Sequence, residues 1–302
     1  MKPILAIAAA TVGLALALGW AVDSVAPLEA RIGNGTLLCG DTHVHTYLSF
    51  HAGTPLVHLV HAHRRGLDFI VFSEHNRVGG GAWGQEVARL VGSPVIVVEG
   101  EEVTNPKYHI NALGISRSIP YTTPADEVVA EIHRQGGLAS ANHPVEKFWP
   151  ALIPLMAERR FDVFEYINMG PWNKGDQPQV DAFVKNMTEA GFLRGVGWVG
   201  VSDTHLGANT GQAKACVVAA ERTWGAIAAE MKAGRSAATI GGRFFGPMAD
   251  ELNANPQAVA KITQEPALWT KVVSHAFFAA LAVAMLGRWG PWGRRGPPPG
   301  SA

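Results

Sequence analysis

The chain has 302 residues, 47% of them hydrophobic and 17% charged, and its 25 Lys and Arg balance its 25 Asp and Glu. This length fits one large catalytic domain with short appendages. A formal net charge of zero provides no overall basic field that would hold nucleic-acid phosphates. We therefore expect a small-molecule substrate and no nucleic-acid partner, and the sequence indicates no protein partner.

The N-terminal region contains an apolar run, residues 3–22, that no charge interrupts. A helix needs about 20 such residues to cross a bilayer, so we expect residues 1–30 to hold an N-terminal membrane helix that anchors the protein. Gly19, Trp20 and Ala21 also fit the cleavage site of a signal segment, and a buried core helix is a further alternative.

The central region, from about residue 36 to residue 239, alternates short apolar runs with helical segments. This pattern predicts an α/β fold in which βα units surround a parallel sheet or barrel. Thr54-Pro55 and Thr123-Pro124 mark two helix starts. The predicted strands are residues 36–43, 68–73, 94–98, 109–115, 138–142, 162–167, 198–202 and 213–218.

Histidines and acidic residues recur where most of these strands end. In an extended segment residues i and i+2 share a face, so His43 with His45, and Asp203 with His205, can face one cavity. Imidazoles and carboxylates together favour Zn, Mn or Fe over Mg or Ca, and a set this large should bind more than one divalent ion. We predict a metal-dependent hydrolase with these ligands: His43, His45, His51, His75, Glu102, His109, His143, Asp203 and His205.

The order of these motifs resembles the polymerase and histidinol phosphatase (PHP) family of metallohydrolases, over about 200 residues. The resemblance implies a distorted (β/α)7 barrel with a two- or three-metal centre at its rim. The motifs that carry it are Asp41-x-His43-x-His45, Glu74-His75-Asn76, Gly100-x-Glu102, His109, His143-Pro144 and Asp203-x-His205. By the same resemblance, His43, His45, Glu102 and Asp203 bind a first ion, Glu102 bridges to a second held by His109 and His143, and His51, His75 and His205 hold a third.

Five further residues are candidates for direct roles in the site. Asp41 is interpreted as an acceptor that orients a ligand histidine, with a strand-end turn as the alternative. Glu165 and Asn168 match a family segment near the cavity and are expected either to contact substrate or to belong to a buried network. We therefore take Asp41 and Glu165 as catalytic candidates, and Asn76, Arg77 and Asn168 as substrate contacts. Glu74, where the family usually has Asp, is expected to support His75.

Three functions remain open from the sequence. The first is a phosphoesterase that uses a metal-activated water. The second is a carbamate or carboxylate ester hydrolase of the same fold, similar to the carbaryl-hydrolase branch of the family. The third is a membrane-tethered metal-binding or sensory module without turnover. Cationic groups near the metals would favour phosphate, whereas an aromatic wall built from Trp83, Phe148, Trp149 or Trp172 would favour a neutral ester.

The C-terminal region completes the predicted organisation, after a hydrolase domain at residues 31–245. Residues 246–267 are expected to form a linker or part of the rim, and residues 268–287 a second membrane helix, with a packed C-terminal helix as the alternative. Residues 288–302 form a basic tail rich in Pro and Gly. Basic residues flank both apolar runs on their outer sides, so the hydrolase domain should face the periplasm or the cell exterior.

The cysteines and three histidines receive structural interpretations. Cys39 and Cys216 are far apart and have no CxxC partner, so we expect two buried small side chains, with an isolated disulfide as the alternative. His58, His61 and His63 fall on the first predicted helix, where we expect them on its solvated face.

Overall fold

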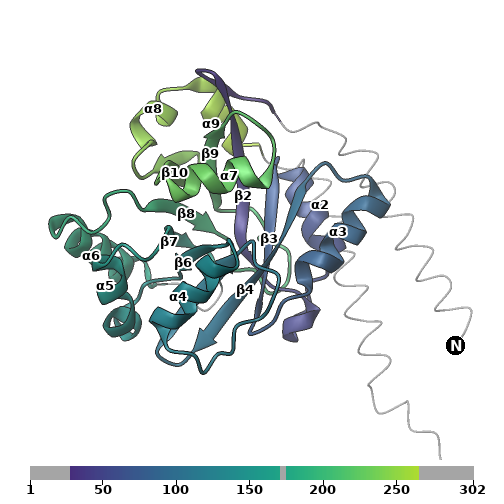
Figure 1. The fold of residues 1–302 in the computed structure, drawn as a ribbon. Coiled ribbons are helices and arrows are strands. Elements are labelled where there is room, and N and C mark those ends of the chain that lie inside the picture. Colours follow the sequence, from purple (N-terminus) through teal and green to yellow (C-terminus); the bar gives the residue numbers. More distant parts are fainter. Residues whose placement is uncertain (1–27, 171–174, 265–302) are drawn as a thin grey trace, which may run out of the picture. The chain divides into compact units, whose positions relative to one another are not determined.

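The computed structural model describes residues 28–170 and 175–264, which belong to one compact unit (Figure 1). The predicted membrane segments and the basic tail lie outside the described residues. Within the described part, no helix is long and apolar enough to cross a membrane.

A single mixed sheet forms the centre of this unit. Its order is β11-β10-β9-β2-β3-β4-β5-β6-β7-β8, with β1 paired to β2. The eight predicted strands correspond to β2 through β9, whereas β1, β10 and β11 were not predicted. The strands are β1 (Arg31–Ile32), β2 (Gly35–Val44), β3 (Phe69–His75), β4 (Ile96–Asn105), β5 (Tyr108–Leu113), β6 (Leu138–Ala141), β7 (Val163–Asn168), β8 (Gly197–Val201), β9 (Lys214–Ala219), β10 (Ser236–Ile240) and β11 (Arg243–Phe245).

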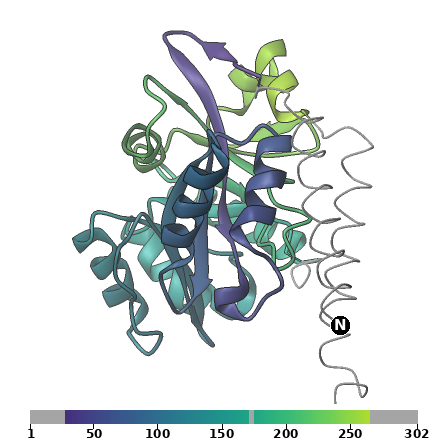
Figure 2. The same ribbon diagram turned by 90° about the vertical axis from the view of Figure 1, so that its right-hand side faces the viewer.

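Helices cover the outer surface of the sheet. Figures 1 and 2 show α2 and α3 side by side next to β2, β3 and β4. The helix start predicted at Thr54-Pro55 is confirmed, because the Thr54 side chain accepts a hydrogen bond from Val57 N and Pro55 is the first residue of α2. The helices are α2 (Pro55–Arg64), α3 (Gly80–Val91), α4 (Ala125–Arg134), α5 (Trp149–Ala157), α6 (Gln177–Glu189), α7 (Trp224–Lys232), α8 (Ala249–Asn253) and α9 (Pro256–Ile262), with 3-10 turns η1 (Tyr47–Ser49) and η2 (Glu146–Phe148).

The expectation of a parallel sheet or barrel holds for only part of the sheet. β2, β3 and β4 are mutually parallel, as are β6, β7 and β8. β5 is antiparallel to both β4 and β6, and β9 is antiparallel to β2. For β4 and β5 the reason is the short connection: Asn105 pairs directly with Tyr108 across a tight turn, which leaves no room for the crossover that parallel neighbours require.

The sheet curls until β8 lies beside β9 and β10. Val44 at the end of β2 forms a parallel bridge with Thr204, just beyond β8. Gly200 on β8 permits close approach, because a Cβ atom there would lie 2.8 Å from the Lys214 carbonyl oxygen and 3.1 Å from Thr239 N. The result is a mixed α/β near-barrel, which confirms the predicted barrel in this coarser form.

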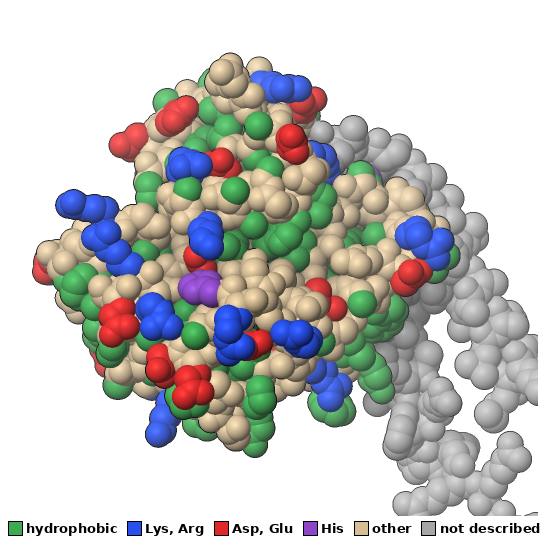
Figure 3. All heavy atoms as spheres, viewed as in Figure 1, with side chains coloured by type: hydrophobic (Ala, Val, Ile, Leu, Met, Phe, Trp, Pro, Cys, Tyr) green, Lys and Arg blue, Asp and Glu red, His purple; other side chains and the backbone are tan. Residues whose placement is uncertain are grey.

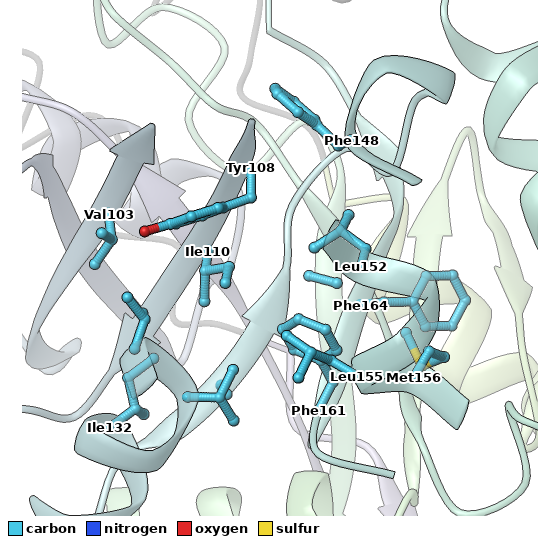
Figure 4. Close-up of a cluster of buried hydrophobic side chains, with 14 of the residues drawn as sticks. Val103, Tyr108, Ile110, Ile132, Phe148, Leu152, Leu155, Met156, Phe161 and Phe164 are labelled. Atoms are coloured by element: carbon cyan, nitrogen blue, oxygen red, sulfur yellow. The ribbon is translucent and has the colours of Figure 1, made fainter. Parts of the chain in front are cut away.

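The largest hydrophobic cluster packs α4 and α5 against β4 to β7 (Figure 4). Phe148 belongs to this cluster and is buried. Its ring centroid also lies 4.7 Å from that of His109 and 5.8 Å from that of His143. The core therefore supports one side of the predicted metal site directly.

Cys39 and Cys216 form a disulfide between β2 and β9. The interpretation as two separate buried thiols is wrong, and the alternative of an isolated disulfide is confirmed. The sequence could not decide this because 177 positions separate the two cysteines. The β2–β9 register makes them direct partners across the antiparallel pair.

One further expectation about the periphery needs correction. His58 and His61 are buried on α2 rather than solvated, and His58 Nδ1 lies 2.8 Å from Thr210 Oγ1. The segment expected as linker or rim contains α8 and α9, whose Leu252 and Ile262 join a buried cluster with the disulfide. Residues 249–262 therefore pack on the disulfide end of the sheet.

Candidate metal centre

The predicted ligands converge at one end of the near-barrel. His43, His75 and Glu102 lie at or near the ends of β2, β3 and β4. β5 runs in the opposite direction, so its second residue, His109, reaches the same end and pairs with Thr104 of β4. A cavity of about 790 Å³ opens at this end, and it is lined by His51, His75, Glu102, His109, His143, Asp203 and His205 among others.

The first group consists of two buried histidines and two carboxylates. Nε2 of His43 and Nε2 of His45 are 2.9 Å apart. Oδ1 of Asp203 lies 3.4 and 3.2 Å from these two nitrogens, and Oε2 of Glu102 lies 3.6 and 3.7 Å from them. Ligands of one tetrahedral Zn at its usual bond lengths are separated by roughly 3.3 Å. The donor types and spacings of this group fit a single divalent ion.

The second group uses the other oxygen of Glu102. Oε1 of Glu102 lies 3.0 Å from Nδ1 of His109 and 3.9 Å from Nε2 of His143. The two imidazole nitrogens are 2.9 Å apart. The carboxylate thus faces the first group with one oxygen and the second with the other, which is the arrangement that a bridging ligand requires.

The third group gathers around His45. Donor atoms of His45, His75 and His205 all lie within 4.8 Å of one another. The ring centroid of His51 is 4.1 Å from that of His205 and 5.4 Å from that of His75. His205 Nδ1 lies 2.9 Å from the Asp203 carbonyl oxygen, so its Nε2 is the nitrogen left for a ligand. All nine predicted ligands therefore meet in one cluster.

One buried carboxylate supports both the first and the second group. Glu165 Oε1 lies 2.6 Å from Nδ1 of His43, and Oε2 lies 3.2 Å from Nδ1 of His143. Oε2 also accepts a hydrogen bond from the backbone N of His143 at 2.8 Å. Each histidine consequently presents Nε2 to its own ligand group, an arrangement common around metal-binding imidazoles.

The electrostatics of the ion-free site favour the ionised carboxylate of Glu165 and two neutral imidazoles, and they favour a proton on His43. Burial alone would raise the pKa of Glu165, but the charge of His43 and hydrogen bonds from both histidines lower it to about 2. Burial lowers the pKa of His45 to about 3 and that of His51 to about 4, which keeps both imidazoles neutral. Burial opposes a charge on His43, but Asp203, Glu165 and Glu102 together raise its pKa well above the usual value. The carboxylates therefore stabilise positive charge at this position.

Backbone strain marks the same region. Asn76, His143 and Asp203 have φ angles of 52°, 24° and 44°, a range that side chains other than Gly rarely adopt. Each follows the end of a strand and turns the chain sharply. Such residues cost about 1 to 3 kcal/mol each and concentrate at functional sites.

Asp41 does not have the predicted contact with a histidine ring. Its carboxylate is buried and accepts backbone hydrogen bonds from His43 N, Ser202 N and Gly211 N at 3.3, 3.1 and 2.8 Å. It lies two residues deeper along β2 than His43 and therefore reaches loop backbone. The orienting role predicted for Asp41 belongs to Glu165.

The predicted substrate contacts are engaged within the protein. The Asn76 side chain donates to Thr104 O at 3.2 Å and accepts from Thr104 N at 2.8 Å. Arg77 donates to Leu48 O at 2.9 Å. Asn168 Nδ2 donates to Glu165 Oε2 at 2.9 Å, within the network below the metals. These contacts favour positioning roles over direct contact with substrate.

Glu74 supports His75 through an intermediary. Glu74 accepts hydrogen bonds from Thr46 N and from the Ser49 hydroxyl, and Ser49 Oγ in turn accepts from His75 N at 2.9 Å. Thr104 Oγ1 also lies 2.8 Å from Nδ1 of His75. Sequence reasoning missed Thr104, although its position two residues after Glu102 puts it on the same face of β4.

The outer part of the cavity is polar. Beyond the ligands it is lined by Thr104, Val145, Glu146, Lys147, Asp176 and Gln179. Among the described residues, none of the predicted wall aromatics lines it: Phe148, for example, lies in the core behind two ligand histidines. The remaining candidate, Trp172, lies outside the described residues. Among the described lining residues, histidine is the sole aromatic type.

Comparison with known sequences gives limited matches. No family model matches the chain. Over 107 residues it is 28% identical to an uncharacterized protein of Methanocaldococcus jannaschii, an alignment that covers 35% of this chain. The chain spans 61% of the length of that relative.

Comparison with solved structures identifies the fold. A two-domain protein of Bacteroides vulgatus, which contains a predicted PHP-like metal-dependent phosphoesterase, is similar with a TM-score of 0.59 and 21% identity, over 77% of this chain and 72% of that one. PsfC of Pseudomonas syringae (TM-score 0.46, 13% identity, 80% and 98% covered) and an amidohydrolase of Chromobacterium violaceum (0.41, 15%, 55% and 87%) are more distant. The first similarity shows a shared PHP-like fold.

Proposed function

We propose that this protein is a metal-dependent hydrolase of the PHP type, and specifically a phosphoesterase that uses two or three divalent ions of Zn, Mn or Fe. The observation that carries the proposal is the bridging position of Glu102, whose two oxygens face two separate ligand groups. Ions bound there would activate a water molecule and stabilise charge on the attacked phosphorus.

The chain's own residues prepare this chemistry. Glu165 fixes the ring orientations of His43 and His143, so that the first two groups keep a constant separation. Asn168 donates to Glu165 and to Asp203 Oδ2, which restrains a carboxylate of the first group. A preorganised ligand set needs little rearrangement as charge develops on the substrate.

A phosphoester is favoured over a neutral carbamate or carboxylate ester. Lys147 is the cation among the described residues that line the cavity, its ammonium 4.5 Å from the centroid of the Phe148 ring, and it lies there with the carboxylates of Glu146 and Asp176. The aromatic wall expected for a neutral ester is not among the described lining residues. The fold shared with a protein that contains a predicted PHP-like phosphoesterase adds support.

We further propose a membrane-anchored protein whose catalytic domain faces the periplasm or the cell exterior. The uncharged run at residues 3–22 and the apolar run at residues 268–287 support the anchoring. The Cys39–Cys216 disulfide supports the outward location, because disulfides persist in oxidising compartments. The face drawn in Figure 3 mixes Lys and Arg with Asp and Glu, which agrees with a small-molecule substrate and not a nucleic acid.

The test is hydrolysis by the full chain loaded with Zn or Mn. Nitrophenyl phosphate, bis-nitrophenyl phosphate and naphthyl carbamate are the substrates, and His143→Ala is the variant. The matched control is His133→Gln, which replaces a histidine that pairs with Asp162 outside the cluster. We expect phosphoester turnover in the wild type and the control, and a loss of at least about 100-fold in His143→Ala. Carbamate turnover alone would replace the phosphoesterase proposal with the ester-hydrolase alternative.

A further inference from the structure

Thr104 is a polar side chain of the cavity wall to which the proposed function gives no part. It lies on β4 two residues after Glu102, so both side chains share one face of the strand. Its register partner on β5 is His109, and it lines the same cavity as the ligand histidines. The Thr104 hydroxyl therefore stands among the candidate metal ligands.

The backbone of Thr104 is held in place by Asn76, the residue after β3. The Asn76 side chain accepts a hydrogen bond from Thr104 N at 2.8 Å and donates one to Thr104 O at 3.2 Å. The Asn76 backbone N donates to Glu102 O at 2.9 Å. These three hydrogen bonds fix the Thr104 hydroxyl relative to the end of β3, where His75 lies.

The hydroxyl of Thr104 contacts one histidine and one carboxylate. Its Oγ1 lies 2.8 Å from Nδ1 of His75, and 3.2 and 3.3 Å from Oε2 and the backbone O of Glu102. Carboxylate and carbonyl oxygens only accept hydrogen bonds, so the single hydroxyl proton is directed to Glu102. The hydroxyl oxygen then accepts a hydrogen bond from Nδ1–H of His75.

The direction of this hydrogen bond decides which nitrogen of His75 is free to bind an ion. A neutral imidazole carries one proton, so a proton on Nδ1 leaves the lone pair on Nε2. His75 belongs to the third ligand group, in which the donor atoms of His45, His75 and His205 lie within 4.8 Å of one another. Thr104 thus favours the form of His75 that offers Nε2 as a ligand.

Oε2 of Glu102 is a second acceptor for the same N–H group, since it lies 2.7 Å from Nδ1 of His75. The same oxygen faces Nε2 of His43 and Nε2 of His45, at 3.6 and 3.7 Å. His75 and the first ligand group therefore compete for this oxygen. The Thr104 hydroxyl reduces the competition, because it gives Nδ1–H another acceptor.

We infer that Thr104 is a positioning residue of the metal centre, which orients His75 for the third ion and leaves Oε2 of Glu102 to the first. The inference rests on the proposed function, because it requires a centre that binds three ions. Thr104 acts through His75 and Glu102 in this role and binds no ion itself.

The experiment measures stepwise Zn binding by the full chain through competition with a chromogenic chelator, in one detergent throughout. Thr104→Val keeps the shape of the side chain and removes the hydroxyl, and Thr104→Ser restores the hydroxyl. We expect the affinity for the third ion to fall about 10- to 100-fold in Thr104→Val and to recover to within about threefold of the wild type in Thr104→Ser. Affinity for the first ion should fall by a smaller factor, and affinity for the second should be unchanged.

A spectroscopic measurement separates this role from a purely structural one. Nitrogen-15 NMR of the histidine-labelled, Zn-loaded protein reports which imidazole nitrogen carries the proton, and His75→Gln assigns the signals of His75. We expect a protonated Nδ1 in the wild type and in Thr104→Ser, and a shift of this signal in Thr104→Val. An unshifted signal would contradict the hydrogen bond on which the inference depends.

The matched control is Thr36→Val, which replaces another partly buried strand threonine at the opposite end of β2 from His43. The control should bind every ion as the wild type does. Unchanged third-ion affinity in Thr104→Val, a loss that Thr104→Ser does not restore, or a wild type that binds only two ions would overturn the inference and leave the phosphoesterase intact. A wild type that binds no ion would overturn the proposed function itself, and the inference with it.

Discussion

The inner and outer parts of the metal cluster are built differently. The inner part, His43, His45, Glu102, His143 and Asp203, is buried and comes mostly from strand ends. Of the outer histidines, His75 lies at a strand end with 30% of its side chain exposed, whereas His51 and His205 lie on loops and the His205 side chain is 12% exposed. Glu165 braces two inner histidines directly, whereas Glu74 reaches His75 only through Ser49.

This difference in burial and support predicts which of the ions bind most tightly. Buried ligands with a shared carboxylate lose little freedom when an ion binds, whereas loop histidines must be ordered. We therefore expect the first two ions to bind more tightly than the third.

The largest expected effect concerns the scaffold of the inner part. The Cys39–Cys216 disulfide joins β2, which carries His43 and His45, to β9 and closes a separation of 177 positions. Replacing both cysteines with Ala should lower the free energy of unfolding by about 4 kcal/mol. Chemical denaturation of the metal-free protein with and without reductant measures this.

The disulfide prediction has an internal control, since reductant should weaken the wild type and leave the double variant unchanged. Tight binding of the first ion by the folded double variant is also expected, because no ligand is altered. A wild-type protein that is insensitive to reductant even when unfolded and refolded in it would contradict the prediction.

Glu165→Gln should weaken binding of the first and second ions together. It removes the charge that orients His43 and His143, and loss of such a partner typically costs 10- to 100-fold in metal affinity. Competition with a chromogenic chelator measures the affinity of the protein for each ion. His109→Ala is the comparison, because it should weaken the second ion alone. If Glu165→Gln weakens only one ion, the shared brace is not the link between the two groups.

The third prediction concerns the support of the outer part. His58 is buried near the loop that leads from His51 to α2: a Cβ atom added to Gly53 would lie 2.3 Å from its Nε2. Burial lowers the pKa of His58 to about 3, whereas an unfolded histidine has a pKa near 6.5. Between these values the unfolded state binds the proton and the folded state does not. Stability is therefore complete above about pH 6.5 and falls as the pH drops towards 3.

Because of His58 alone, the free energy of unfolding should be about 2 kcal/mol lower at pH 5 than at pH 7. His58→Asn keeps a polar group near Thr210 Oγ1 and removes the titration. Denaturation at both pH values in the presence of a chelator should show a smaller acid-induced loss for the variant. Equal acid-induced losses of stability in the wild type and the variant would contradict the prediction.

The sequence predicted which candidate ligands lie together far better than it predicted the residues that support them. His43, His45, Asp203 and His205 could be grouped because alternation along an extended chain places them on one face. The roles of Asp41 and Glu165 were not predictable in this way, since they depend on how deep each carboxylate lies and on the curvature of the sheet. The Cys39–Cys216 bond likewise depends on a strand register between distant segments.

Strand direction and side-chain exposure were also poorly predicted, because both depend on tertiary packing. The short turn between Asn105 and Tyr108 is a local signal for antiparallel pairing, but the strands predicted at residues 94–98 and 109–115 left this turn outside both strands. The burial of His58 follows from contact with Thr210, more than 150 positions away. Local patterns thus predict which residues share a strand face, and tertiary packing decides which of them support the site.

The smallest expected effect separates the outer part from the inner one most directly. His51→Ala should weaken binding of the third ion by about tenfold, so that this ion is lost at limiting Zn. Binding of the first two ions should be unchanged, because His51 contacts other histidine rings and not Glu165. Metal content after dialysis against limiting Zn, compared with His109→Ala, measures this. If each variant loses one ion, then the second and third ions are lost independently of each other, from sites on opposite sides of Glu102. Loss of two ions in His51→Ala would instead mean that His45, which touches both the first and third groups, couples the loop to the buried end.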